Sequence, residues 1–313
     1  MAKKFVTQVI LSVFIAISII GILNFIIDPF NLNKVFNLNL PKDKVSYIMH
    51  YRLYKMIEFL NSPKSNIILG DSRTDGLKVE YFNELGVADI YNFAYGGGTL
   101  YEEIDTFWFA IQYIKPEKVI ISVPFNLFNE NNTKNMVKES ESMIKNPLEY
   151  YFNSFILKAS LLNLYTKLTG KMWRTERPAM NKEAFWTYQL GTEVTGRYYN
   201  SFIYPIHLLD CIKKISDYGE ENNIELQFFI PPTHVELQNK VNEYGIQKYY
   251  EDYKKELARY SEVIDFDYPN EVTINKDNFK DPYHANENIE IKIVNELVEK
   301  TKTFSRRYGV SAH

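Results

Sequence analysis

The longest apolar stretch of the chain runs from Phe5 to Ile27, directly after Lys3 and Lys4. As a helix it would be about 34 Å long, which is enough for the roughly 30 Å hydrocarbon core of a bilayer. This length, and the lack of a convincing small-x-small cleavage site after it, favour an uncleaved signal-anchor over a cleaved signal peptide. The two lysines would stay in the cytoplasm and the rest of the chain would lie outside.

Beyond a polar linker, short apolar runs alternate with segments of helical spacing. The runs predicted to be strands are 66–69, 88–95, 119–123, 224–230 and 263–266, and the predicted helices are 46–60, 77–85, 102–113, 207–222, 247–260 and 288–302. Continuous apolar strands separated by helices indicate a parallel sheet that is buried on both faces. We therefore predict an α/β fold, a flavodoxin-like three-layer sandwich with a central parallel sheet of about five strands.

One long segment, residues 129–204, interrupts this alternation. Residues 147–168 have helical apolar spacing, and Trp173 and Trp186 follow among several arginines, which include Arg177. We expect a mostly helical insertion, which either shapes a substrate cleft at the carboxyl edge of the sheet or is packing decoration. The predicted organisation is a transmembrane helix at 1–28, a juxtamembrane linker and helix at 29–65, a catalytic domain at 66–302 and a loose tail at 303–313.

Composition narrows the classes of function. The chain has 313 residues, of which 45% are hydrophobic and 24% charged, as in an ordinary globular protein. The net charge of −3 offers no broad basic field, so we predict no nucleic-acid partner. The single cysteine, Cys211, rules out an intrachain disulfide and a cysteine-based metal site. We predict neither a metal nor another cofactor.

The candidate chemistry begins at Asn66–Gly76, which reads NIILGDSRTDG. An apolar strand that stops at a glycine and turns into a helix places the turn at the carboxyl edge of the sheet, where ligands of open α/β folds bind. Ser72 in this turn would lie near a helix N-terminus, which favours developing negative charge. We interpret Ser72 as a nucleophile, and the alternative is that Asp71 or Ser72 only caps the helix.

A serine nucleophile needs a base, a group that orients this base, and donors for the oxyanion. His284 follows the last predicted strand at the same sheet edge, and Asp281 stands three residues before it, so the carboxylate can curl back to the imidazole. The second strand ends in Gly96–Gly98 and the third in Asn126. Taken alone, the D-x-x-H segment could be a helix cap beside a surface histidine.

This order of segments resembles the SGNH (GDSL-type) hydrolase and acyltransferase superfamily over about 66–302. The resemblance implies that Ser72 is the nucleophile and that Asp281 and His284 are the orienting acid and the base. It also implies an oxyanion hole formed by the backbone N–H of Ser72, a glycine N–H at Gly97 and the side chain of Asn126.

The third segment departs from the pattern of that superfamily. The usual G-x-N-D is absent, and the chain has Val-Pro-Phe-Asn at 123–126 instead, which bears on the role of Asn126. Arg73, next to the nucleophile, is a candidate substrate contact. His234, after two prolines at the end of the fourth strand, is a candidate substrate contact or alternative base.

The anchor, the G-D-S-R-T segment, the helical insertion and D-x-x-H together look like the membrane-anchored branch that acts in teichoic-acid D-alanylation and alginate O-acetylation. The resemblance implies acyl transfer to a cell-envelope or extracellular polysaccharide, beside a multipass membrane-bound O-acyltransferase partner. An esterase or lipase of the same fold, and a non-catalytic assembly or glycan-binding partner, are the alternatives. A weaker alternative is a phosphate-binding flavodoxin-like module that uses Gly96–Gly98 as its anion loop, because this alternative gives Asp281 and His284 no role.

Overall fold

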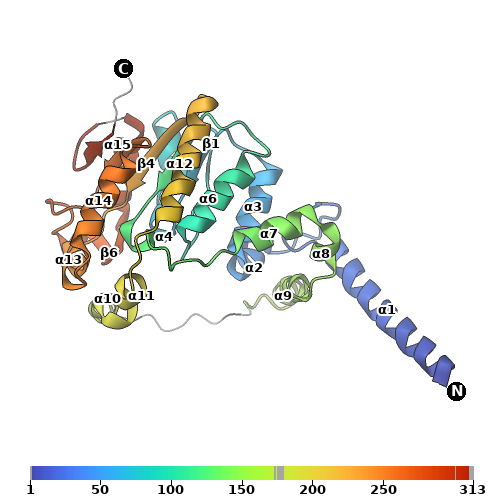
Figure 1. The fold of residues 1–313 in the computed structure, drawn as a ribbon. Coiled ribbons are helices and arrows are strands. Elements are labelled where there is room, and N and C mark those ends of the chain that lie inside the picture. Colours follow the sequence, from blue (N-terminus) through green and yellow to red (C-terminus); the bar gives the residue numbers. More distant parts are fainter. Residues whose placement is uncertain (1, 173, 175–179, 300, 310–313) are drawn as a thin grey trace. The chain divides into compact units, whose positions relative to one another are not determined.

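The computed structural model describes residues 2–172, 174, 180–299 and 301–309, and Figure 1 shows it as a ribbon. The chain divides into two compact units. Unit 1 is Met1–Ser62 with Met136–Pro178, and unit 2 is Pro63–Asn135 with Ala179–His313. The segment 129–204, expected to be one insertion, is thus divided: residues 136–178 group with the N-terminal part of the chain. Trp173 and Arg177 lie outside the described residues.

Unit 2 is an α/β domain built on a six-stranded sheet in the order β2-β1-β3-β4-β5-β8. The strands are β1 Asn66–Leu69, β2 Ile90–Asn92, β3 Lys118–Ser122, β4 Glu225–Ile230, β5 Glu262–Asp265 and β8 Arg306–Tyr308. The first five are parallel, in the flavodoxin-like order 2-1-3-4-5, which confirms the predicted α/β class and mostly parallel sheet.

The sixth strand was not expected, because residues 303–313 were predicted to be a loose tail. Strand β8 pairs antiparallel with β5 and extends the sheet. Arg307 fixes this pairing, since its guanidinium donates to Glu262 at 2.8 Å and to the backbone oxygen of Glu296 at 2.8 Å. The prediction for this segment was wrong because a strand this short and this charged gives no pattern in the sequence. It forms because β5 offers an edge to pair with.

Helices cover both faces of the sheet. Those of unit 2 are α4 Ser72–Asp75, α5 Val79–Glu84, α6 Leu100–Ala110, α10 Lys182–Leu190, α11 Thr192–Tyr199, α12 Ile206–Glu221, α13 Val235–Glu243, α14 Gln247–Leu257 and α15 Glu287–Glu299. Ile68, Ile120 and Phe229 pack in one core with residues of α5 and α15. Because side chains alternate along a strand, their neighbours face the other way, where α6 and α12 pack against β1 and β4 (Figure 1).

Two short elements carry residues of the predicted site. The 3-10 helix η1, Phe125–Leu127, follows β3, and a small hairpin is formed by β6 Phe279–Asp281 and β7 His284–Ala285. A second 3-10 helix, η2 Lys276–Asn278, leads into this hairpin. The hairpin was not predicted, because its strands are too short to show periodicity in the sequence.

Unit 1 is helical. Its helices are α1 Ala2–Ile27, α2 Lys42–Met49, α3 Tyr51–Asn61, α7 Val137–Lys145, α8 Pro147–Tyr151 and α9 Ser154–Thr169. The helix predicted at 46–60 is two helices that meet at His50, whose Nδ1 accepts from the Leu53 N–H and so caps α3. Within the described residues, α1 is the one helix long and apolar enough to cross a membrane.

Candidate active site

Ser72 stands at the turn between β1 and α4, at the carboxyl end of the strand. Asp71 is the N-cap of α4, where its Oδ1 accepts from the Arg73 N–H at 3.0 Å, and Ser72 is the first helical residue. Gly70 leaves room for this tight turn, because a Cβ there would lie 2.1 Å from Thr74 Oγ1. The cap and the candidate nucleophile are therefore neighbouring residues, and the cap leaves the Ser72 hydroxyl available.

The structure brings together three residues that the sequence separates widely. Ser72 Oγ lies 2.8 Å from His284 Nε2, and His284 Nδ1 lies 2.8 Å and 2.9 Å from the two carboxylate oxygens of Asp281. The hairpin β6–β7 supplies both partners, so Asp281 and His284 reach the serine as one rigid turn. This is the hydroxyl–imidazole–carboxylate array that activates a serine for attack on a carbonyl carbon.

The carboxyl group of Asp281 is held in its ionised form. Burial works to raise its pKa, but the hydrogen bond and the charge of His284 and the backbone N–H groups of Tyr283 and His284 outweigh burial and lower the pKa below its ordinary value. The two backbone bonds measure 2.8 Å and 3.2 Å. An ionised Asp281 fixes the tautomer of His284, with the proton on Nδ1 and the lone pair of Nε2 toward Ser72.

A cavity of about 180 Å³ opens beside this array. Its lining includes Asp71, Ser72, Arg73, Gly97, Gly98, Thr99, Asn126, Leu127, Asn132, Lys134, Gln189, Tyr198, Tyr283 and His284. Ser72 and His284 are both half-buried, so the hydroxyl meets the cavity without being fully exposed to solvent. The cavity is large enough for the reacting end of a substrate and leaves the rest of a large one outside.

The three groups expected to form an oxyanion hole all line the cavity. Ser72 begins a helix, so its N–H has no intrahelical acceptor. Gly97 has a φ of +60°, which suits the turn that follows β2. Asn126, in η1, is only 6% exposed, and its amide has no hydrogen-bond partner among the described residues. Asn126 thus lines the same cavity as Ser72 and Gly97, although the sequence around it departs from G-x-N-D.

Arg73 borders the cavity, but its guanidinium is already paired with the Asp71 carboxylate. Its Nε and Nη2 donate to the carboxylate of Asp71 at 2.5–3.1 Å, and both side chains are almost fully buried. Burial works to lower the pKa of the guanidinium, but Asp71 outweighs it and raises the pKa. The geometry therefore gives Arg73 a structural part, holding the cap of α4 in place, before any contact with a substrate.

His234, the other candidate substrate contact, lies away from the cavity. Its Nδ1 accepts from the Glu236 N–H at 3.3 Å and caps α13, and its ring packs edge-on against Trp186 and Phe279. Its backbone N–H donates to the Pro282 oxygen, which ties the loop after β4 to the hairpin of Asp281 and His284. His234 thus caps α13 and is not among the described residues that line the cavity.

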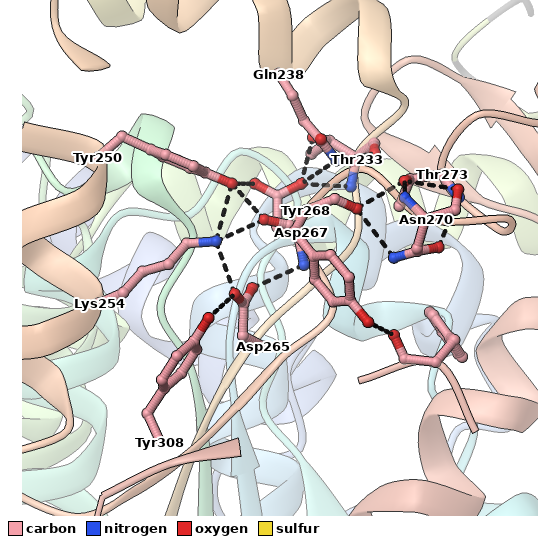
Figure 2. Close-up of polar contacts among 11 residues, drawn as sticks. Thr233, Gln238, Tyr250, Lys254, Asp265, Asp267, Tyr268, Asn270, Thr273 and Tyr308 are labelled. Carbon is pink, nitrogen blue, oxygen red and sulfur yellow. Dashed lines mark hydrogen bonds and ion pairs between the residues drawn. The ribbon is translucent and has the colours of Figure 1, made fainter. Parts of the chain in front are cut away.

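A buried polar cluster supports the same sheet edge, and Figure 2 shows its contacts. The Asp267 carboxylate accepts from the Thr233 N–H and hydroxyl at 2.9 Å and 2.6 Å, from Gln238 at 3.0 Å and from Tyr250 at 3.1 Å. Lys254 donates to Asp265 at 2.8 Å and to the Asp267 backbone oxygen at 2.6 Å. We call these residues the Asp267 cluster; it fixes the loops after β4 and β5.

Sequence reasoning missed several residues of the cavity. Lys134, Gln189 and Tyr198 come from the segment predicted as an insertion, and none belongs to a recognisable pattern. Their approach to the Ser72 turn depends on how the loop after η1 and helices α10 and α11 fold back, which no local signal specifies. Among the described residues, no cluster of three or more His, Cys, Asp or Glu side chains could hold a metal ion.

No protein-family model and no curated protein matches the chain. Twelve chains among the solved structures match, and they include the following three. A Bacteroides fragilis protein described as an acylhydrolase is 13% identical, with a TM-score of 0.34, and the match covers 76% of this chain and 89% of that one. A Streptococcus pneumoniae protein described as a platelet activating factor is 11% identical, with a TM-score of 0.40 and coverage of 83% and 94%.

A GDSL-like lipase from Bacteroides thetaiotaomicron is 12% identical, with a TM-score of 0.36 and coverage of 76% and 88%. Likeness this low carries no argument about activity, so any assignment depends on the geometry of the site. The chain is an α/β protein with a mostly parallel six-stranded sheet, and it carries a Ser72–His284–Asp281 array at the carboxyl edge of that sheet.

Proposed function

We propose that the protein is an enzyme of the SGNH type that transfers acyl groups through an ester on Ser72. The observation that carries this proposal is the continuous chain of short contacts from Ser72 Oγ through His284 to Asp281, beside an open cavity. Neither a helix cap nor a surface histidine requires such an alignment. The GDSL-like and acylhydrolase descriptions of two structural neighbours agree with this chemistry but do not carry it.

The first half of the reaction forms the acyl-enzyme. His284 Nε2 takes the hydroxyl proton while Ser72 Oγ attacks the acyl carbonyl carbon. The negative charge that develops on the carbonyl oxygen is held by the Ser72 N–H, the backbone at Gly97 and the Asn126 amide. When the tetrahedral intermediate collapses, the bond to the leaving alcohol breaks, and that alcohol takes the proton from His284.

The second half releases the acyl group. A hydroxyl of the acceptor approaches the ester, His284 takes its proton, and the oxygen attacks the same carbonyl carbon. Collapse breaks the bond to Ser72 Oγ, which recovers its proton from His284. An acceptor from a polysaccharide or polyol polymer makes the enzyme an O-acyltransferase, whereas water makes it an esterase.

Location favours the transferase. Helix α1 is long and apolar enough to span a membrane, and Lys3 and Lys4 precede its apolar part, which by the positive-inside rule supports a catalytic unit outside the cytoplasm. The proposed acceptor is therefore a cell-envelope or extracellular polysaccharide. A multipass membrane-bound O-acyltransferase that delivers the acyl group from the cytoplasmic side is the proposed partner.

A serine-reactive fluorophosphonate probe tests the nucleophile on the full chain in detergent. Wild type is expected to be labelled at Ser72, and Ser72→Ala is expected to lose all labelling. Ser62→Ala, which removes an exposed hydroxyl in unit 1, is the matched control and should label like wild type. Labelling that survives in Ser72→Ala contradicts the proposed nucleophile.

A second experiment separates transfer from hydrolysis. The full chain is given an acetyl ester with increasing amounts of a soluble glycan acceptor, and both free acetate and acetylated glycan are measured. Transfer predicts that acetylated glycan rises as acetate falls, whereas hydrolysis undiminished by the acceptor supports the esterase. Cells in which Ser72→Ala leaves the surface polymer fully acylated would instead support the non-catalytic partner.

A further inference from the structure

Helix α9, Ser154–Thr169 in unit 1, carries apolar side chains on its exposed face. Its buried side carries Ile156 and Ala159 together with the polar residues Ser160, Asn163 and Thr166, while the opposite side carries a stripe of apolar residues at helical spacing. The stripe consists of Leu157, Leu161, Leu164, Tyr165 and Leu168, and we call it the α9 stripe. A helix at the surface of a water-soluble domain has the opposite arrangement, with its apolar stripe against the core.

Three residues of the α9 stripe are exposed, and Leu157 and Leu164 are half-buried. Leu168 is 83% exposed, Leu161 51% and Tyr165 45%. Single exposed apolar residues are ordinary on protein surfaces, but several that line one face of a helix mark a contact surface. Exposure of this kind in water would be unfavourable, at about 25 cal/mol per Å² of apolar area left uncovered.

The buried side of α9 is joined to its neighbours by polar contacts. Ser160 donates to Asn24 Oδ1 of α1 at 2.9 Å, and Asn163 donates to Ser46 Oγ of α2 at 2.9 Å. Asn24 in turn donates to the Tyr151 backbone oxygen of α8 at 2.7 Å. Hydrogen bonds and small residues between helices, with apolar residues outside, are the packing that helices adopt when lipid surrounds them.

The place where α9 meets α1 fits the edge of a bilayer. A helix the length of α1 spans about 39 Å, longer than the ~30 Å hydrocarbon core, so one end reaches into the interface. Asn24, in the last two turns of α1, accepts from Ser160 of α9, and Gly21 in the same turns lies under the ring of Phe152, the residue that ends α8. Phe25 packs against Phe36 and Tyr151 beside them, as aromatic residues do at membrane interfaces.

We propose that α9 lies in the membrane–water interface next to the C-terminal end of α1, with the α9 stripe against lipid. The occupant of this surface is the bilayer, because α9 contacts α1, whose own apolar residues are exposed, with Ile22 57% exposed. The exposed Lys158 and Lys167 stand on α9 outside the stripe, where their ammonium groups can reach lipid headgroups. Unit 1 is thereby attached to the membrane at two places, one spanning and one lying on the surface.

Lipid quenching of a fluorophore on the full chain tests this placement. In a Cys211→Ser background, single cysteines at Leu161→Cys and Leu168→Cys are labelled with a bimane dye, and the protein is reconstituted into nanodiscs with or without doxyl-labelled lipid. Ile10→Cys in α1 is the control inside the bilayer, and Glu139→Cys, exposed on α7, is the control in water. These four positions are exposed, so the labels leave the packing of unit 1 intact.

The proposal predicts that doxyl lipid reduces emission at Leu161→Cys and Leu168→Cys about two-fold or more, as expected for probes some 5–10 Å into the interface. Doxyl lipid should change the emission at Glu139→Cys little. Iodide in the water should quench the dye at Glu139→Cys well and the dyes at the two leucine positions poorly. Leucine positions quenched by iodide but not by lipid overturn the proposal. Protection from both quenchers also overturns it and shows that protein covers the stripe. Absence of lipid quenching at Ile10→Cys overturns the premise of the proposal, which is that α1 spans the bilayer.

Discussion

Unit 2 contains two polar clusters of similar composition with opposite character. The Ser72–His284–Asp281 array and the Asp267 cluster both combine carboxylates with hydroxyl groups and a side-chain nitrogen, and both form where parallel strands end. In the Asp267 cluster, the carboxylate accepts four hydrogen bonds from three residues and is buried. Within the part of the chain that the structure describes, the Ser72 hydroxyl has one hydrogen-bond partner, His284, and it borders a cavity.

The difference shows what separates a candidate catalytic group from a structural one at the same edge of a sheet. A buried network in which most groups are paired makes the loops rigid and leaves no atom for a substrate. A hydroxyl that is aligned with a base and open on its other side can react. Residue types alone do not distinguish the two clusters, so variants in each should affect different properties.

The largest effect is expected for Ser72→Ala. Turnover of an acetyl ester should fall by about 10⁴-fold or more, since the aligned groups act as a unit. The free energy of unfolding should change by less than about 0.5 kcal/mol, because a half-buried hydroxyl with one partner contributes little to stability. Steady-state kinetics and urea denaturation on the same preparation measure both quantities. A large loss of stability would make Ser72 a structural residue like those of the Asp267 cluster.

The opposite result is expected for Lys254→Met. Removing Lys254 leaves Asp265 buried without its partner, which should cost about 3–5 kcal/mol of unfolding free energy. The activity of the molecules that remain folded should be unchanged. Lys255→Met, an exposed neighbour on α14, is the matched control, and the double variant Lys254→Met/Asp265→Leu should recover most of the loss.

The stability loss in Lys254→Met should also depend on pH. Burial raises the pKa of Asp265 to about 6 although Lys254 opposes it, and removing Lys254 raises it further. A protonated Asp265 needs no cation, so the loss should be smaller at pH 5 than at pH 8. Urea denaturation at both values checks the sign, and an equal loss at both would contradict the buried ion pair.

Asn126→Ala comes next in size. If the amide stabilises the oxyanion, kcat should fall by about 10²–10³-fold with little change in KM, as for other oxyanion-hole donors. Asn131→Ala, on the exposed loop after β3, should behave like wild type. Kinetics over a range of ester concentrations separate the two constants. A change confined to KM would show that Asn126 binds the substrate and does not stabilise the transition state.

The smallest effect concerns Asp281 and stability. Its pKa in the folded protein lies below the ordinary value of 3.8, so the ionised form favours folding above that value, and this contribution is lost as the pH falls through the folded pKa. Wild type should be more stable than Asp281→Asn by roughly 1–2 kcal/mol at neutral pH, and the difference should shrink below about pH 4. Urea denaturation from pH 3 to 7 tests it, with Asp277→Asn as the exposed control. A difference independent of pH would exclude the charge of Asp281 as its cause.

The sequence by itself predicted the parts of this protein whose signals are local. Continuous apolar runs give β1 and β3, because a strand buried on both faces needs apolar residues throughout. The glycine and Ser72 after β1, and Asp281 three residues before His284, are readable for the same reason. Each depends on neighbours within a few positions, and the order of the segments suggested that they would meet.

Only the tertiary structure decided which distant residues meet and which groups are left open. It placed His284 within hydrogen-bond distance of Ser72, and it assigned His234 to a helix cap although both histidines follow strands at the same edge. It also paired residues 306–308 with β5 and divided the predicted insertion between two units. The physical reason is that burial and the completeness of hydrogen bonding depend on every segment packed around a residue, whereas a sequence pattern reports only the segment that contains it.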